Sequence, residues 1–154
     1  MNFRATSTFT GLNQSVALAA FAQASRLSAG QSAEIVLEEA EALVPVSSGD
    51  LRDSGHTDLQ MIDGKATGFV IFDAPHAQFV EYGTGVRGIG SYPFDLPESG
   101  VPITGNWVYD YRGRNWKGMT AQPYARPALD TARPAILEVY RDNYQLACKL
   151  LGTR

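Results

Sequence analysis

The sequence contains little of what catalytic and metal-binding sites usually need. It has one cysteine, Cys148, so no disulfide can form within the chain and no cysteine-rich metal site is possible. Neither of its two histidines, His56 and His76, has a carboxylate at the helical spacing of a zinc site. A pair of Cys148 with a histidine is disfavoured as a nucleophile, because no electropositive turn surrounds that cysteine to stabilise a thiolate. We therefore predict no metal site and no cysteine chemistry.

Cationic charge and long apolar runs are also scarce. Thirteen Lys and Arg residues stand against sixteen Asp and Glu, and the formal net charge of −3 gives no general attraction to nucleic acid or to an anionic membrane. The most apolar stretch, residues 16–24, is rich in alanine and far too short to span a membrane. With no sign of a secretory signal, we expect a protein made in a cytoplasm or in a particle assembled there.

What is present is a pattern of long helices near both ends. Residues 12–44 are rich in Ala, Leu and Glu with apolar residues at helical spacing, and Pro45 ends the run. Gly30 lies in the middle and leaves open whether this is one helix or two. A second helix is predicted from about residue 131 to 151, with Pro134 tolerated near its start. Its predicted buried stripe consists of Ile136, Tyr140, Tyr144, Ala147 and Leu151.

Shorter elements are predicted between these helices. Asp63-Gly64 is a strong signal for a two-residue hairpin turn, and it places Leu59 and Met61 on one face with Ala66, Val70 and Phe72. The capping-box spacing of Ser47 and Asp50 predicts a helical turn over residues 48–54, and a second short helix is predicted from Pro75 to Tyr82, ended by Gly83. We predict one α+β domain over residues 1–154, with the helices packed on a small antiparallel sheet.

Residues 84–119 are predicted to form an extended arm, because they are rich in glycine and proline and lack a sustained period. Within the arm, aromatic and cationic residues alternate: Trp107, Tyr109, Tyr111, Arg112, Arg114 and Trp116. Such residues are typical anchors of subunit interfaces, and they would equally suit a hairpin that covers the domain's own core. Binding to single-stranded nucleic acid is less favoured, because the chain is acidic.

Two enzyme hypotheses are weak. Residues 83–88 have the G-x-G-x-x-G spacing of a dinucleotide site, but they follow a helix rather than a strand, so we predict no cofactor. A small hydrolase could use paired carboxylates, yet the candidates are scattered through the loop without a fixed separation. These candidates are Glu81, Asp95, Glu98 and Asp110.

Three stretches together carry a family resemblance. They are VPVSSGDLR at residues 44–52, HAQFVEYGTG at residues 76–85 and QPYARPAL at residues 122–129. In this order, with a hairpin between the first two, they resemble the tail-component proteins of tailed bacteriophages, the neck or tail-completion family of lambdoid siphophages. Two positions depart from the family pattern: Ser47 stands where an acidic residue is common, and Gly55 where an apolar one usually follows the serine.

The resemblance implies a structural protein without catalysis or cofactors. It implies a ring at the head–tail junction of a virion, with sixfold symmetry to match the tail tube. The partners would be further copies of the chain and other neck and tail proteins, such as a stopper, terminator or tube, and packaged DNA would pass nearby without specific binding. A tail terminator or minor capsid protein is the alternative, since the same fold could serve either role.

Three charged residues stand within the resembling stretches, namely Arg52, Glu81 and Arg126. Each is surrounded by apolar and turn-forming residues, and charges in such places persist when they are paired. We predict that these residues are structural and form ion pairs near the junction of the sheet and the last helix.

Overall fold

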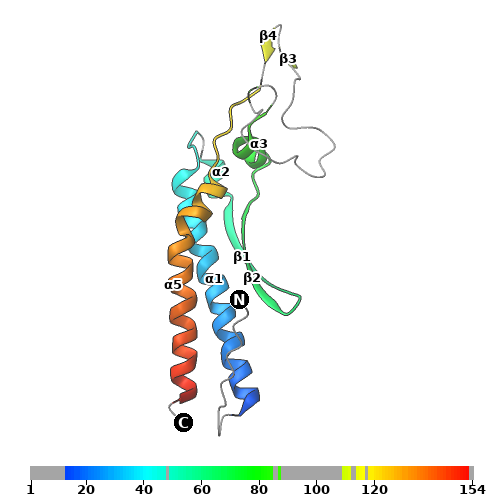
Figure 1. The fold of residues 1–154 in the computed structure, drawn as a ribbon. Coiled ribbons are helices and arrows are strands. Elements are labelled where there is room, and N and C mark those ends of the chain that lie inside the picture. The colour runs from blue at the N-terminus through cyan, green and yellow to red at the C-terminus, as the bar shows by residue number, and fades with distance from the viewer. Residues whose placement is uncertain are drawn as a thin grey trace, which may run out of the picture.

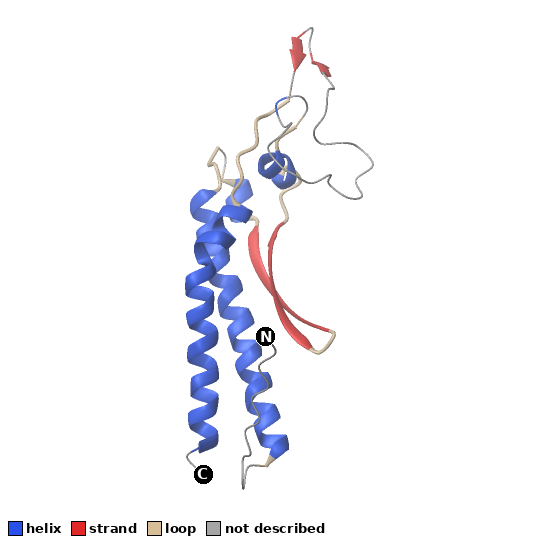
Figure 2. Ribbon diagram, in the orientation of Figure 1, coloured by secondary structure: helices blue, strands red, loops and turns tan. Residues whose placement is uncertain are grey.

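The computed structural model describes residues 13–47, 49–84, 87, 109–111, 114–116 and 118–152. Two long helices, α1 (Gln14–Leu43) and α5 (Ala125–Gly152), lie side by side and run in opposite directions (Figure 1). At 1.5 Å per residue each is roughly 40–45 Å long. A two-stranded antiparallel sheet lies beside α1, as Figure 2 shows, so the predicted α+β arrangement is confirmed.

Helix α1 is a single element that passes through Gly30 without a break. The side chain of Asn13 caps its start, where Oδ1 accepts a hydrogen bond of 3.0 Å from the Ser15 amide. A glycine inside a helix costs only about 1 kcal/mol relative to alanine. Packing along a 30-residue helix outweighs that cost, so the question of one helix or two is resolved in favour of one.

Small side chains bring α1 and α5 close together. The buried residues of α1 are all alanine or serine, and the buried residues of α5 are Ala128, Ala132 and Ala147. Asn143 of α5 ties the pair together, since its Nδ2 donates to Ser28 Oγ at 3.1 Å and to Gln31 Oε1 at 2.8 Å. The small side chains of alanine and serine let two helices approach closely, and alanine, the more frequent of the two here, also has the highest helix propensity.

Helix α5 begins at Ala125, six residues before the predicted start, so Pro134 lies well inside it. The prediction that Pro134 is tolerated only near a helix start was therefore wrong, because packing against α1 holds the helix across the missing amide donor. The predicted stripe is also partly wrong. Ala147 is buried, but Tyr144 is 37% exposed and stacks on Phe21 with 5.9 Å between the ring centroids.

Strands β1 (Gly55–Ile62) and β2 (Lys65–Phe72) form the predicted hairpin with its two-residue turn at Asp63-Gly64. The register pairs Met61 with Ala66 and confirms the predicted shared face. That face lies close to α1 at Gly68, where an added Cβ would collide with the Ala29 carbonyl oxygen and the Ala33 methyl group. Towards its tip the hairpin curves away from α1 (Figure 1).

Two short helices flank the hairpin. Helix α2 (Asp50–Asp53) is present, but the predicted capping box is wrong, because its N-cap is Gly49 with a φ of 94° and no side-chain cap. Ser47 lies three residues before the first helical residue, too early to cap it. Helix α3 (Ala77–Tyr82) ends at Gly83, whose φ of 72° favours glycine, as predicted.

Only part of the predicted arm lies among the described residues. Strands β3 (Tyr109–Tyr111) and β4 (Arg114–Trp116) pair antiparallel, with Tyr109 opposite Trp116. Trp107 and Arg112, which we predicted at a subunit interface, lie outside the described residues, as do Asp95 and Glu98.

Candidate functional site

The three resembling stretches meet at one end of the helix pair. Val44, Leu51, Tyr124 and Ala128 of the first and third stretches form a small buried core together with Ala40 of α1. Phe72 at the end of β2 and Val80 of α3 pack against this core. The residues that resemble the phage family therefore build the junction between α1, α3, α5 and the hairpin.

Glu81 caps the start of α5 from a distant part of the chain. Its Oε2 accepts hydrogen bonds from the backbone amides of Tyr124 at 2.7 Å and Ala125 at 3.0 Å, and its Oε1 accepts from the Arg126 amide at 3.4 Å. The side chain is buried with only 5% of the residue exposed. A carboxylate at a helix N-terminus pairs with amides that have no partner in the helix and with the positive end of the helix dipole. Glu81 therefore stabilises the first turn of α5.

Tyr124 is the aromatic residue of the third stretch and lies beneath this cap. Its ring meets Phe72 edge to face with 4.9 Å between centroids, and its hydroxyl donates weakly to the Ala77 carbonyl at 3.5 Å. Burial raises the pKa of the Tyr124 phenol from 10 to about 12, with smaller contributions from the charges of Glu81 and Tyr82. The phenol therefore stays neutral inside the core.

The raised pKa of Tyr124 predicts a loss of stability in alkali. The unfolded chain releases this proton near pH 10 and the folded chain near 12, so stability is intact below pH 10 and falls between pH 10 and 12. We expect the loss to reach about 2 kcal/mol. Tyr124→Phe should remove this part of the pH dependence in urea unfolding, while Tyr144→Phe at a more exposed ring should not. Equal alkaline slopes for the wild type and Tyr124→Phe would contradict the prediction.

The base of the arm is closed by backbone pairing between Thr84 and Met119. The Thr84 amide donates to the Met119 carbonyl at 2.8 Å, and the Met119 amide donates to the Thr84 carbonyl at 3.1 Å and to Thr84 Oγ1 at 2.9 Å. Next to this pair, the Gln122 amide donates to the Val80 carbonyl at 2.8 Å. These bonds link the end of α3 to the approach to α5, and Glu81 continues the same link.

The stretch around Ser54 and Gly55 is equally structural. Ser54 Oγ donates to the Leu51 carbonyl at 2.7 Å and accepts from the Ala74 amide at 3.2 Å, joining α2 to the end of β2. A Cβ on Gly55 would lie 2.9 Å from both Leu37 Cδ1 and Phe72 Cε1. The glycine at position 55, where the family pattern usually has an apolar residue, is therefore explained by the lack of space for a side chain.

The predicted trio of charges lies in three different settings. Arg52 Nε is 3.5 Å from Asp53 Oδ1, and both side chains are largely exposed. Glu81 is buried, and Arg126 contributes its backbone amide to the cap. Ion pairing among Arg52, Glu81 and Arg126 stays a prediction. The sequence analysis missed the capping role of Glu81. It also placed the start of α5 too late, although Pro127, which needs no amide partner in a first helical turn, was a usable signal for the earlier start.

Other candidate groups gather into no reactive cluster in the described part of the chain. No group of three or more metal-ligating side chains occurs among the described residues, and Cys148 is exposed on α5. His56 Nδ1 lies 3.6 Å from Asp73 Oδ2 at the surface. Among the described helices, none has the length and apolar character needed to cross a membrane.

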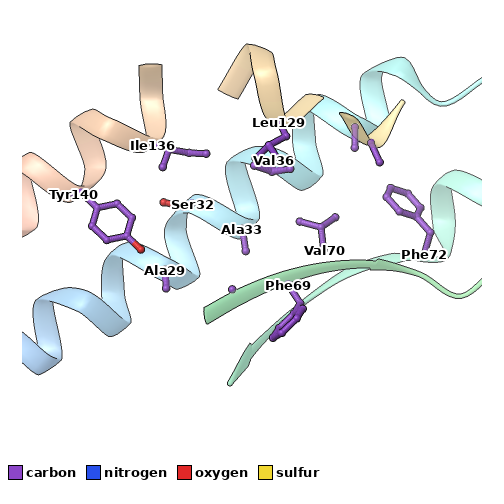
Figure 3. A pocket seen from close by; sticks show the side chains of 13 residues that line it. Ala29, Ser32, Ala33, Val36, Phe69, Val70, Phe72, Leu129, Ile136 and Tyr140 are labelled. Atoms are coloured by element: carbon purple, nitrogen blue, oxygen red, sulfur yellow. The ribbon is translucent and has the colours of Figure 1, made fainter. Parts of the chain in front are cut away.

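A groove of about 370 Å³ runs over α1 between β2 and α5 (Figure 3). Ala29, Ala33 and Val36 of α1 form its floor, and Leu129 and Ile136 stand among its α5 side chains. Its thirteen lining residues are almost all apolar. The groove is therefore an apolar surface between the main elements.

Together these features define a structural scaffold, in which the distinctive residues cap, pack and tie elements together. Residues 18–83 match the family model HK97-gp10_like, described as "Bacteriophage HK97-gp10, putative tail-component". The range covers most of α1 and the elements through α3, so the predicted resemblance is confirmed there, and residues 122–129 lie outside it. No curated protein and no solved structure matches the chain. The family match indicates a structural component of a phage tail.

Proposed function

We propose that this protein is a structural component of a tailed-phage or phage-like particle and forms a ring at the head–tail junction. The family match over residues 18–83 carries the proposal, since it indicates a tail component and hence a place in the virion. As a neck or tail-completion protein it would contact further copies of itself and neighbouring tail proteins. It would act by binding and positioning, without catalysis.

The geometry supports such a role because the base of the arm is firmly attached. Backbone pairing of Thr84 with Met119 and capping of α5 by Glu81 hold both ends of residues 84–119 on the helix scaffold. A projecting segment with a fixed base can reach a neighbouring subunit while the scaffold keeps its shape. In this proposal the arm, with Trp107, Tyr109, Tyr111, Arg112, Arg114 and Trp116, is an interface between subunits.

The test is the assembly state of the purified protein and its binding to tail tubes. We expect concentration-dependent rings by native mass spectrometry, and rings on tube ends by negative-stain microscopy. A protein that stays monomeric at all concentrations and never binds a tube or joins a particle would overturn the proposal. Rings found within the head shell would favour a minor capsid role.

Trp116→Ala tests the role of the arm. Aromatic interface anchors commonly cost about 2 kcal/mol or more when truncated, so we expect this variant to assemble only at much higher concentration. In this proposal its unfolding midpoint stays unchanged, because an anchor that packs on a neighbouring subunit contributes little to the fold of its own chain. Titration with labelled single-stranded DNA is the control. Salt-sensitive micromolar binding that Trp116→Ala abolishes would show a nucleic-acid site instead.

A further inference from the structure

One side of the groove over α1 is the edge of a strand. Strand β2 lines the groove and β1 does not, and among the described residues β2 pairs with β1 alone. The two-residue turn makes Ile62 and Lys65 a hydrogen-bonded pair, so alternate residues of β2 direct their backbone N–H and C=O groups away from β1, on the groove side. These residues are Ala66, Gly68 and Val70. A strand edge of this kind is a template for one further strand.

An apolar track leads from the groove towards the start of α1. Ala29, Ala33 and Val36 form the floor of the groove (Figure 3). Leu18 precedes Val36 by about five helical turns, so it lies on the same side of α1 as the floor. It is 63% exposed. A segment that entered the groove from the start of α1 would therefore cover Leu18 on its way.

The sequence just before α1 has the pattern of a half-buried strand. Residues 3–10 read FRATSTFT and precede the described part of the chain. Their odd positions are apolar or small and their even positions are polar, which is the two-residue period of a strand with one buried face. Threonine and phenylalanine are enriched in strands, and no proline interrupts the run. The odd positions are Phe3, Ala5, Ser7 and Phe9.

We propose that residues 3–10 of the same chain form a third strand, which pairs with β2 and turns its apolar face to α1. Gly68 approaches Ala29 and Ala33, and Phe72 packs near Ala40, so β2 runs in the same direction as α1. A segment joined to the start of α1 must run back along that helix to reach the groove. The new strand is therefore antiparallel to β2, and it closes an edge through which separate copies would otherwise pair.

The length of the segment and its attachment favour this occupant over a second copy. Ala29 lies about 24 Å along α1 from Asn13. Residues 3–12 in extended form span about 33 Å, so Phe3 reaches over the floor while Phe9 stays near Leu18. A short tether gives an effective concentration on the order of millimolar, which separate copies in dilute solution do not reach. This inference does not depend on the proposed ring.

Amide hydrogen exchange, measured by NMR below the concentration of any assembly, tests the strand directly. In the full chain we expect protection at the Gly68 and Val70 amides, which the new strand would pair, as well as at Thr67 and Phe69, which face β1. Deletion of residues 1–10 should speed exchange at Gly68 and Val70 by about tenfold or more and leave Thr67 and Phe69 unchanged. Unprotected Gly68 and Val70 in the full chain, or protection that survives the deletion, would overturn the proposal.

Two double variants test which face of the segment is buried. Phe3→Asp with Phe9→Asp places charges on the face turned to α1 and should speed exchange at Gly68 and Val70 as the deletion does. Thr6→Asp with Thr8→Asp adds the same charge to the opposite face and should leave exchange as in the wild type. Equal effects of the two variants would contradict the proposed strand. Protection that appears only as the concentration rises would assign the edge to a neighbouring copy and would also overturn it.

Because every readout comes from the monomer, failure of the strand leaves the ring proposal untouched, and failure of the ring leaves the strand untouched.

Discussion

Replacing Glu81 by alanine is expected to lower the free energy of unfolding by about 3 kcal/mol. The variant removes the acceptor of three backbone amides at the start of α5, and the Tyr124 amide would stay buried without a partner. Urea unfolding followed by circular dichroism measures the loss. Hydrogen exchange at residues 124–126 should show that the first turn of α5 opens more readily than in the wild type.

Two variants separate capping from ion pairing at this site. Glu81→Gln keeps one acceptor oxygen but loses the charge, so its loss of stability should be clearly smaller than that of Glu81→Ala. Arg126→Met keeps the backbone amide that donates to Glu81 and removes only the side-chain charge. If Arg126→Met costs as much as Glu81→Ala, the ion pair predicted from the sequence is the dominant interaction. A negligible effect of Glu81→Ala would exclude both roles.

Gly68→Ala is expected to destabilise the protein by about 2 kcal/mol. Its new methyl group would meet the Ala29 carbonyl oxygen and the Ala33 methyl group, and neither belongs to a flexible side chain that could move aside. The hairpin would have to lift from α1 or α1 would have to bend. Thermal and urea unfolding measure the loss, and the groove between β2 and α5 should change shape with it.

Gly30→Ala provides the matched control for this prediction. The two glycines undergo the same chemical change, but a Cβ at Gly30 would meet nothing within 4 Å. Because alanine favours the helix, this variant should stabilise the protein by about 0.5–1 kcal/mol. If Gly30→Ala raises the free energy of unfolding and Gly68→Ala lowers it, then the contact of residue 68 with α1, and not the loss of a glycine, determines the change in stability. Destabilisation of equal size by both variants would contradict the explanation.

Local rules alone determined several elements of this protein. The hairpin turn at Asp63-Gly64 follows from a dipeptide that tolerates positive φ, and the structure has φ of 49° and 75° at these residues. The long helix before Pro45 and the glycine end of α3 follow from similar local preferences. The family resemblance came from three stretches, and the family match covers residues 44–52 and most of residues 76–85, which encode local turns and short helices, but not residues 122–129.

Only the tertiary structure shows where α5 starts and that Glu81 caps it. The cap joins residues more than forty positions apart, and sequence spacing cannot show that a carboxylate after one short helix will reach the first amides of another. The need for glycine at position 68 likewise depends on how closely β2 approaches α1. Local propensity sets which segments become helix or strand, because it acts over a few residues. The ends of those segments, and the groove between them, depend on contacts that exist only after the chain has folded.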